Sequence, residues 1–580
     1  NIMKLRRIKI HGYRGIVDEE FVFRDYSLLV GPNNAGKSTV IDAIRAFYEK
    51  DGFKFRKESD APLASPADEE SWIEREFDLT DQEFDSLKDE YKAPGKRLRV
   101  RKYFQTSEKT HDGKPASGWI FGYKRDGTLS KEPFYGAKNV QSGKFGDLVY
   151  IPAISKVDEH AKLSGPSSLR DLLADIMSDV VEAGRAYGEF STSVSKFSAA
   201  IREERTRDDR SLAGLEEELN GLLKPWDTEF RLRFPPPSVN DIIKSMVSWE
   251  LVDRSHGKPQ SIDCYGSGFQ RHFIYSLVQI GARYAGKKPA KKSKDFAPSL
   301  NLILFDEPEA FLHPPQQEIL ARSLIALASS ENWQVVCATH SPYFVSRNAA
   351  DIPAIIRLQR DAGVIRKYQI DPAAWERIAN ANLVINDIAE KYPHVKRLLH
   401  QDDLKPEMEV VKHFLWLNPD RSSLFFANHV LLVEGPTEVA LINRLIGDGK
   451  IENADCGLYV LDCLGKYNIH RFMNLLKGLG IAHSVVYDDD NDSREHEDIR
   501  RLIEDSAHPM LTLRVERIRG DLEAMLGVPP AGAKHRKPQH VLYWYTSGRI
   551  DKEKLDAFCE LVSRCLPGGV AQEHVKSKVA

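Results

Sequence analysis

The sequence contains little of what stabilises small secreted proteins or anchors membrane proteins. Its 580 residues include six cysteines and no CxxC pair, which excludes a zinc ribbon and leaves too few cysteines for a disulfide framework. No stretch approaches the ~20 apolar residues of a membrane-spanning helix. Lys4, Arg6, Arg7 and Lys9 interrupt any secretory apolar segment near the start. We therefore expect a protein of the cytoplasm with no membrane partner.

The chain also lacks a strong net charge. Its 82 lysines and arginines balance 85 acids, which gives a formal net charge of −3. Any binding to nucleic acid must then come from local basic patches, because no global field draws the protein to it. The composition is otherwise that of a globular protein, with 42% hydrophobic and 29% charged residues. The length suffices for roughly three to five domains.

Hydrophobic periodicity changes along the chain. Residues 72–77, 97–101 and 119–123 alternate apolar and polar side chains between turn residues, which predicts an antiparallel β lobe. Between 169 and 219, apolar residues recur at spacings of three, four and seven, which predicts a helical insertion. Apolar strands alternating with helical patterns follow in the second half of the chain. These patterns predict two α/β units, the first interrupted by the insertion.

Three arginines of the predicted lobe, Arg97, Arg99 and Arg101, share one face of their strand. A solvated outer face is the ordinary cause of such alternation. A phosphate-binding face is the alternative, and the sequence leaves both open.

A nucleotide-binding pattern follows the first buried strand. Residues 31–39 (GPNNAGKST) fit G-x-x-x-x-G-K-[ST] between a strand at 26–30 and an amphipathic helix, a context that strongly favours a nucleotide site over a chance match. The glycines let backbone amides curl around phosphate oxygens, Lys37 would reach the β- and γ-phosphates, and the Ser38 hydroxyl would ligate Mg²⁺. The predicted nucleotide-binding residues of this loop are Gly31, Asn34, Gly36, Lys37, Ser38 and Thr39.

Two later apolar strands end in residues that would complete this site. The strand at 302–305 delivers Asp306, which we expect to bind the metal, and Glu307, which we expect to activate water. The strand at 333–338 is followed by His340, which we place at the γ-phosphate. A purely structural histidine is the alternative for His340.

These motifs resemble the ABC-type ATPase heads of the RecF, SMC and OLD families. The resemblance covers about residues 3–370 and rests on the phosphate loop, DEPE at 306–309, LHP at 312–314 and THSP at 339–342. It implies that Ser267 and Gly268, in YGSGFQ, form a variant signature that closes over ATP of the other protomer in a head-to-head dimer. A glycine-rich helix-start loop is the alternative. It further implies that Arg14 lies near the phosphates.

A second set of acids lies in the final third of the chain. One apolar strand ends in Glu434, before a Gly-Pro turn, an N-capping Thr437 and Glu438 in the first helical turn. Another strand ends before Asp488 and Asp490, which alternation puts on one face. Strands of an open parallel sheet present their sites at the carboxyl ends, so we expect these acids to meet.

This donor set favours Mg²⁺ or Mn²⁺ over zinc, because it offers carboxylate oxygens without a His or Cys pair. A solvated acidic turn would account for residues 489–492 alone. It would not account for Glu434 and Glu438 placed before it, and clustered carboxylates repel one another without a cation. We therefore predict metal-dependent chemistry at these acids.

The acidic motifs resemble the Toprim domain, through Glu434-Gly435, the loop containing Gly465, and the Asp-x-Asp motif. The resemblance implies that Glu434 is the catalytic glutamate and that Asp488 and Asp490 are the paired metal acids.

An ATPase head followed by a Toprim domain is the arrangement of the OLD-family nucleases. This resemblance implies a later acid, matched by Glu523, and a lysine near the scissile phosphate. Lys537 is our candidate for the lysine and Lys534 the alternative, while a solvated basic loop would explain both without a role in catalysis. The predicted catalytic residues are Glu434, Asp488, Asp490, Lys537, Glu307 and His340; the predicted metal ligands are Glu434, Glu438, Asp488, Asp490, Glu523, Ser38 and Asp306.

The resulting prediction is an α/β protein: an ABC-type P-loop ATPase head with a β lobe and a helical dimerisation insertion, then a Rossmann-like Toprim domain. Its parts are the ATPase at 1–160 and 236–372, the insertion at 161–235, a helical linker at 373–420 and the Toprim domain at 421–580.

The predicted activity is an ATP- and Mg²⁺-dependent DNA endonuclease that nicks or cuts by two-metal phosphodiester hydrolysis, with Mn²⁺ as the alternative metal at the Toprim site. The resemblance implies a role in defence against bacteriophage or in DNA repair, a homodimer or higher homo-oligomer, and a helicase partner. The alternatives are a RecF- or SMC-like DNA clamp without nuclease activity and a Toprim topoisomerase.

Overall fold

The computed structural model describes most of the chain. The described residues are 3–49, 52–62, 68–135, 145–152, 173, 177, 185–226, 228–232, 234, 237–285, 296, 300–329, 333–345, 349–398, 409, 412, 418–452, 454–489 and 494–568. They belong to two compact units, one formed by residues 1–153 and 293–580 and the other by residues 154–292. Within these described ranges, no helix is both long and apolar enough to cross a membrane.

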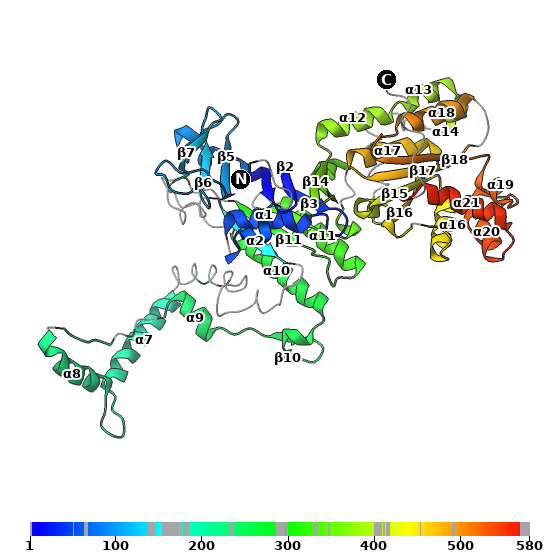
Figure 1. Ribbon diagram of the computed structural model, residues 1–580. Helices are drawn as coiled ribbons and strands as arrows, with labels where there is room; N and C mark the ends of the chain where they lie inside the picture. Colours follow the sequence, from blue (N-terminus) through cyan, green and yellow to red (C-terminus); the bar gives the residue numbers. More distant parts are fainter. Residues whose placement is uncertain are drawn as a thin grey trace. The chain divides into compact units, whose positions relative to one another are not determined.

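A six-stranded sheet carries the phosphate loop in the first unit (Figure 1). Its strand order is β14-β13-β3-β12-β11-β8, and only β14 runs antiparallel to its neighbour. The strands are β3 (Tyr26–Val30), β8 (Asp147–Ile151), β11 (Asn301–Asp306), β12 (Gln334–Ala338), β13 (Ile355–Asp361) and β14 (Val364–Gln369). Helices α1 (Lys37–Tyr48) and α11 (Pro314–Ser329) pack on it. Apolar residues fill β3, β11 and β12 because these strands are central and buried.

The predicted antiparallel lobe is present as a second six-stranded sheet, in the order β2-β1-β4-β5-β6-β7. Its strands are β1 (Lys4–Tyr13), β2 (Ile16–Val22), β4 (Ser71–Asp78), β5 (Arg97–Gln105), β6 (Ile120–Tyr123) and β7 (Leu129–Pro133). Short helices α2 (Lys57–Asp60) and α3 (Asp81–Ser86) lie in its connections.

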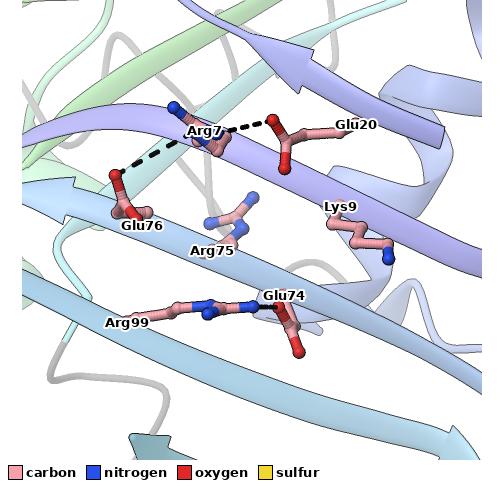
Figure 2. A pocket seen from close by; sticks show the side chains of 7 residues that line it. All are labelled: Arg7, Lys9, Glu20, Glu74, Arg75, Glu76 and Arg99. Atoms are coloured by element: carbon pink, nitrogen blue, oxygen red, sulfur yellow. Dashed lines mark hydrogen bonds and ion pairs between the residues drawn. The ribbon is translucent and has the colours of Figure 1, made fainter. Parts of the chain in front are cut away.

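The arginine stripe of this lobe lies opposite acids. Arg99 and Arg101 of β5 both pair with Glu74 of the adjacent strand β4, whose side chain is 3% exposed. Figure 2 shows a small pocket of the lobe, where Arg7 pairs with Glu20 and lies near Glu76. Arg97 in turn pairs with Glu76 and Asp78. Because each arginine of the stripe has a carboxylate partner, the arrangement favours an outer face held by ion pairs over a phosphate-binding face.

A four-stranded parallel sheet forms the C-terminal part of the first unit, in the order β16-β15-β17-β18. Its strands are β15 (His429–Val433), β16 (Leu458–Asp462), β17 (Ala482–Asp488) and β18 (Thr512–Ile518). Figure 1 shows α17 (Ile469–Gly478) and α18 (Arg494–Asp505) on one face of the sheet, with α16 (Pro436–Gly447), α20 (Lys537–Thr546) and α21 (Lys552–Arg564) on the other. Helix α19 (Leu522–Leu526) contacts α21. This is the Rossmann-like layering that the sequence predicts.

The predicted helical linker contains α12 (Pro372–Asn382), α13 (Ile385–Lys391) and α14 (Pro393–Leu398). Most of residues 399–417 lie outside the described part of the chain.

The second unit contains helices where the sequence predicts the insertion. Its elements are α7 (Arg185–Glu203), α8 (Leu212–Leu223), α9 (Val239–Met246), the hairpin of β9 (Leu251–Asp253) and β10 (Lys258–Gln260), and α10 (Ser267–Ala285). An Arg202–Glu216 ion pair joins α7 to α8. The part of the predicted helical pattern before residue 185 lies outside the described residues, apart from residues 173 and 177.

Candidate nucleotide and metal sites

Lys37 is held inside the phosphate loop. Its Nζ donates to the carbonyl oxygens of Gly31 (2.9 Å) and Pro32 (3.0 Å) and lies 3.4 Å from Nδ1 of His340. Burial lowers the pKa of Lys37 to about 8. The loop therefore holds an ammonium group ready to receive an anion.

The glycines of the loop are required by close packing against the β13–β14 hairpin. Gly31 and Gly36 have φ of +141° and +103°, values that other residues rarely adopt. A Cβ on Gly31 would lie 2.2 Å from the Leu358 carbonyl oxygen, and one on Gly36 would lie 2.4 Å from Ile365. Arg360 of the same hairpin donates to the Asn34 side chain at 3.0 Å. The sequence analysis missed this hairpin.

The strand ends β11 and β12 bring their polar residues to the loop. Ser38 Oγ, at the start of α1 with Thr39, donates to Asp306 Oδ1 at 3.3 Å. Burial raises the pKa of Asp306 to about 6. His340 Nε2 lies 3.5 Å from Glu307 Oε1. The structure thus brings Asp306, Glu307 and His340 to the phosphate loop, as the sequence predicts.

Glu309 is a residue of this site to which the sequence analysis assigned no role. Its carboxylate accepts hydrogen bonds from Thr339 Oγ1 (2.7 Å) and from the His340 backbone amide (2.5 Å). Burial raises its pKa. Glu309 therefore fixes the backbone that presents His340, and its place in the DEPE motif was the available signal.

Arg14 lies in an ion-pair cluster. Its guanidinium contacts Asp42 of α1 at 2.9 Å and Asp60 at 2.8 Å. A direct role for Arg14 at the phosphates stays a prediction.

Ser267 and Gly268 begin helix α10 in the second unit. Gln270 Nε2 donates to the carbonyl oxygens of Tyr265 (2.8 Å) and Ile262 (3.2 Å), and so holds the preceding turn. This is the geometry of a helix-start loop, and the signature role of the two residues stays a prediction.

Glu434 and Asp488 meet at the carboxyl edge of the C-terminal sheet. Glu434 directly follows β15, Asp488 ends the neighbouring parallel strand β17, and Glu434 Oε2 accepts a hydrogen bond from the Asp488 backbone amide at 3.2 Å. The Glu434 carbonyl oxygen accepts a hydrogen bond from the backbone amide of Gly465, in the loop after β16, at 2.7 Å. Three strand ends therefore build this edge.

Glu438 lies in the first turn of α16, as predicted, but the prediction that Thr437 caps this helix was wrong. The helix begins at Pro436 with Gly435 as its N-cap, and Glu438 Oε2 accepts the Gly435 amide at 3.0 Å. A proline favours the first helical position, which shifts the helix start ahead of Thr437. Thr437 is consequently buried inside the helix.

The carboxyl groups at this edge disfavour one another's charge. Burial, followed by repulsion from Glu434 and Glu438, raises the pKa of Asp488 to about 8. Burial, with repulsion from Glu434 and Glu523, raises the pKa of Glu438 to about 7. Burial also raises the pKa of Glu434. A bound cation would offset this repulsion.

The donors fit a hard divalent cation, because they are carboxylate oxygens and because Asp488 Oδ1 is buried without a hydrogen-bond partner. Among the described residues, no three His, Cys, Asp or Glu side chains form a ready-made metal cluster. Asp490 and Asp492 lie outside those residues. Asp489 instead pairs with Arg500 at 2.6 Å and Arg517 at 3.7 Å, so its charge is already matched.

Two lysines border the acids. Lys537 Nζ contacts Glu523 Oε1 at 2.8 Å, which brings together the predicted lysine and the predicted later acid. Lys534 lies in the preceding turn and is exposed. The sequence analysis missed Lys466, which is 6% exposed and lies within electrostatic reach of Glu434 and Asp488. Its position directly after Gly465 was the available signal.

Comparison with known proteins identifies the family. A model described as "AAA domain, putative AbiEii toxin, Type IV TA system" matches residues 27–346, more than half of the chain. The chain belongs to this AAA-domain family. A second model, the Toprim domain of proteins like "Overcoming lysogenization defect protein", matches residues 425–490. An AAA domain followed by this Toprim domain is the OLD arrangement.

Relatives of the OLD type align along the chain. Old nuclease of Escherichia phage P2 is 25% identical over 532 residues, which cover 89% of this chain and 82% of that protein. Endonuclease GajA of Bacillus cereus is 23% identical, covering 85% of this chain and 76% of that protein. OLD nuclease of Thermus scotoductus is 26% identical over 39% of this chain and 37% of that protein. The ATPase-head and Toprim prediction is thereby confirmed.

Proposed function

We propose that the chain is an ATPase-linked, divalent-metal-dependent endonuclease that cuts DNA. The observation that carries the proposal is the meeting of Glu434 and Asp488 at one sheet edge, with raised carboxyl pKa values that a cation would relieve. The OLD-type relatives, named as nucleases and endonucleases, support the same activity. By family resemblance, we propose defence against bacteriophage or DNA repair as the setting.

The residues at the acidic edge have distinct roles in this proposal. Glu434 and Asp488, with Glu438, Glu523 and Asp490, would hold Mg²⁺ or Mn²⁺. Two such ions supply an activated water and stabilise the leaving oxygen of a phosphodiester. Lys537 and Lys466 border the acids and would offset charge that develops on the phosphate.

The nucleotide site would bind ATP with Mg²⁺. Lys37 and the loop amides would bind the phosphates, and Ser38 with Asp306 would hold the ion. Glu307 would accept a proton from water, and His340, fixed by Glu309, would contact the γ-phosphate. Arg14, Ser267 and Gly268 would complete the site in a dimer of heads.

The helical insertion would form part of the homodimer. Its described helices expose large apolar side chains, with Phe197 63%, Leu222 72% and Trp226 70% exposed. Apolar groups exposed to this extent favour contact with a partner surface. By family resemblance, a helicase is a candidate additional partner.

The experiment is a cleavage assay on supercoiled, linear and RNA substrates with Mg²⁺ or Mn²⁺, with and without ATP. We expect Glu434→Gln to reduce cleavage by at least about 10²-fold, the scale seen when a charge-stabilising group is removed. The same variant should hydrolyse ATP within about twofold of the unaltered protein. Lys37→Ala should show loss of ATP hydrolysis and keep Mn²⁺ binding at the Toprim site.

The outcome decides between the rival functions. Normal folding with no cleavage in any metal would support the DNA-clamp alternative. Covalent protein–DNA adducts after denaturation would support a topoisomerase. Loss of both activities in a folded Glu434→Gln protein would contradict the division between the two sites.

A further inference from the structure

The β13–β14 hairpin contacts the phosphate loop on one side. Arg357 of β13 pairs with Val30, the last residue of β3, and Gly31 follows directly in the chain. The next hairpin residue, Leu358, is the one against which Gly31 packs. The position of β13 is therefore tied to the start of the phosphate loop.

On its other side, the same hairpin holds the C-terminal sheet through a buried charge. Arg357 is fully buried. Its guanidinium donates to four backbone carbonyl oxygens: Phe425 (3.2 Å), Ala427 (3.0 Å), Leu479 (3.2 Å) and Gly480 (3.2 Å). Only arginine offers a planar fork with enough donors for so many acceptors.

The four carbonyls belong to the two segments that lead into the acid-bearing strands. Ala427 lies two residues before β15, which Glu434 directly follows, and Gly480 lies two residues before β17, which ends at Asp488. The fit is close, because a Cβ on Gly480 would lie 2.2 Å from Tyr368 of β14. One side chain thus bridges the starts of both strands.

We propose that Arg357 is a positioning residue that couples the phosphate loop to the spacing of Glu434 and Asp488, so that nucleotide binding changes the metal affinity of the acidic edge. This inference rests on the proposed function, whose metal and nucleotide sites it connects. Strands are stiff, so a displacement of their starts reaches their ends. Coupling is reciprocal: metal at the acids changes nucleotide affinity by the same factor.

The test measures Mn²⁺ binding by thermal unfolding, with and without a saturating non-hydrolysable ATP analogue. Only the Mn²⁺-dependent rise in unfolding temperature that the Glu434→Gln variant lacks is counted as binding at the acidic edge. In the unaltered protein, we expect the analogue to shift the Mn²⁺ midpoint by about fivefold or more, the usual scale of coupling between sites. Arg357→Lys keeps the charge but loses the fork, and we expect it to reduce the shift below about twofold while ATP hydrolysis stays within about twofold.

Arg75→Lys is the matched control. Arg75 is also fully buried on a strand, β4, where it lies over the Phe47 ring and reaches the Ile44 carbonyl oxygen. This variant should lower the unfolding temperature and keep the nucleotide-dependent shift, which separates coupling from general loss of stability. Should Arg357→Lys fail to fold, Arg360→Gln removes the exposed contact with Asn34 and should also reduce the shift.

If folded Arg357→Lys kept the full nucleotide-dependent shift of the Mn²⁺ midpoint, the proposal would be overturned. If Arg357→Lys does not fold, a full shift in Arg360→Gln would overturn it. So would the absence of any shift in the unaltered protein. A protein that shows the coupling but cuts no DNA would keep the inference and refute the nuclease function instead.

Discussion

The nucleotide site and the acidic edge both lie at the carboxyl ends of parallel strands, yet their charges are balanced differently. In the nucleotide site, the Lys37 ammonium is held by two carbonyl oxygens, and Asp306 accepts a hydrogen bond from Ser38. At the acidic edge, burial, followed by repulsion from neighbouring carboxyl groups, raises the pKa of Asp488 to about 8 and that of Glu438 to about 7.

Burial disfavours ionised groups in both sites, since it lowers the pKa of Lys37 to about 8 and raises that of Asp306 to about 6, but the nucleotide site sets a cation beside its acids. The nucleotide site has its cation in place before any ligand binds. The carboxylates of the other site oppose folding when they are ionised, because their folded-state pKa values exceed those of the unfolded chain. Their effect is absent below the ordinary pKa near 4 and grows as the pH rises toward about 8 for Asp488. Metal would reverse that penalty.

The largest expected effect comes from removing the carboxylate with the highest pKa. Asp488→Asn should raise the unfolding temperature of the metal-free protein at pH 8 by about 2 °C or more, because it removes a repelled charge. The same change should weaken Mn²⁺ binding by more than about 10-fold, because a ligand oxygen loses its charge. Calorimetry with and without Mn²⁺ measures both. A lower unfolding temperature of Asp488→Asn at pH 8 without metal would show that the ionised carboxyl group of Asp488 does not destabilise the folded protein.

A smaller effect should come from the balanced site. Glu309→Gln removes the carboxylate charge and replaces one of the two acceptor oxygens with an NH₂ group, so that only one oxygen remains for the Thr339 and His340 donors. We expect kcat for ATP hydrolysis to fall by about 10-fold, because misplaced catalytic groups are costly. Nucleotide affinity, set by Lys37 and the loop, should change by less than about threefold. A loss of nucleotide affinity as large as the loss of kcat would show that Glu309 contributes to nucleotide binding by the phosphate loop.

The sequence predicts the strands that carry chemistry better than the hairpin that joins the sites. The apolar run at 26–30 coincides with β3, and the acids sit at strand ends because local pattern determines both. Arg357 gave no such signal. A strand arginine is ordinarily exposed, and this one is buried only because its carbonyl partners lie 68 to 123 residues further along the chain. Thr437 was misplaced for a local reason, the proline one residue before it.

The smallest predicted effect distinguishes the two ends of the C-terminal sheet. His429, at the start of β15, and His483, near the start of β17, are buried, and burial lowers both pKa values to about 4. An imidazole that stays neutral when folded stabilises fully above the unfolded pKa of about 6.5, and this contribution is lost as the pH falls toward about 4.

His429→Leu should therefore lessen the drop in unfolding temperature between pH 7 and pH 5 by about 2 °C. Asp488→Asn should instead deepen that acid-side drop, because the raised pKa of Asp488 makes the folded protein gain stability from this carboxyl group as the pH falls from 7 to 5. We therefore expect His429→Leu to gain stability at low pH and Asp488→Asn to gain stability at high pH. Such opposite responses would show that the histidines at the strand starts and the acids at the strand ends contribute to stability in different pH ranges. Identical pH profiles for the two variants would mean that neither group titrates in the way that its burial requires.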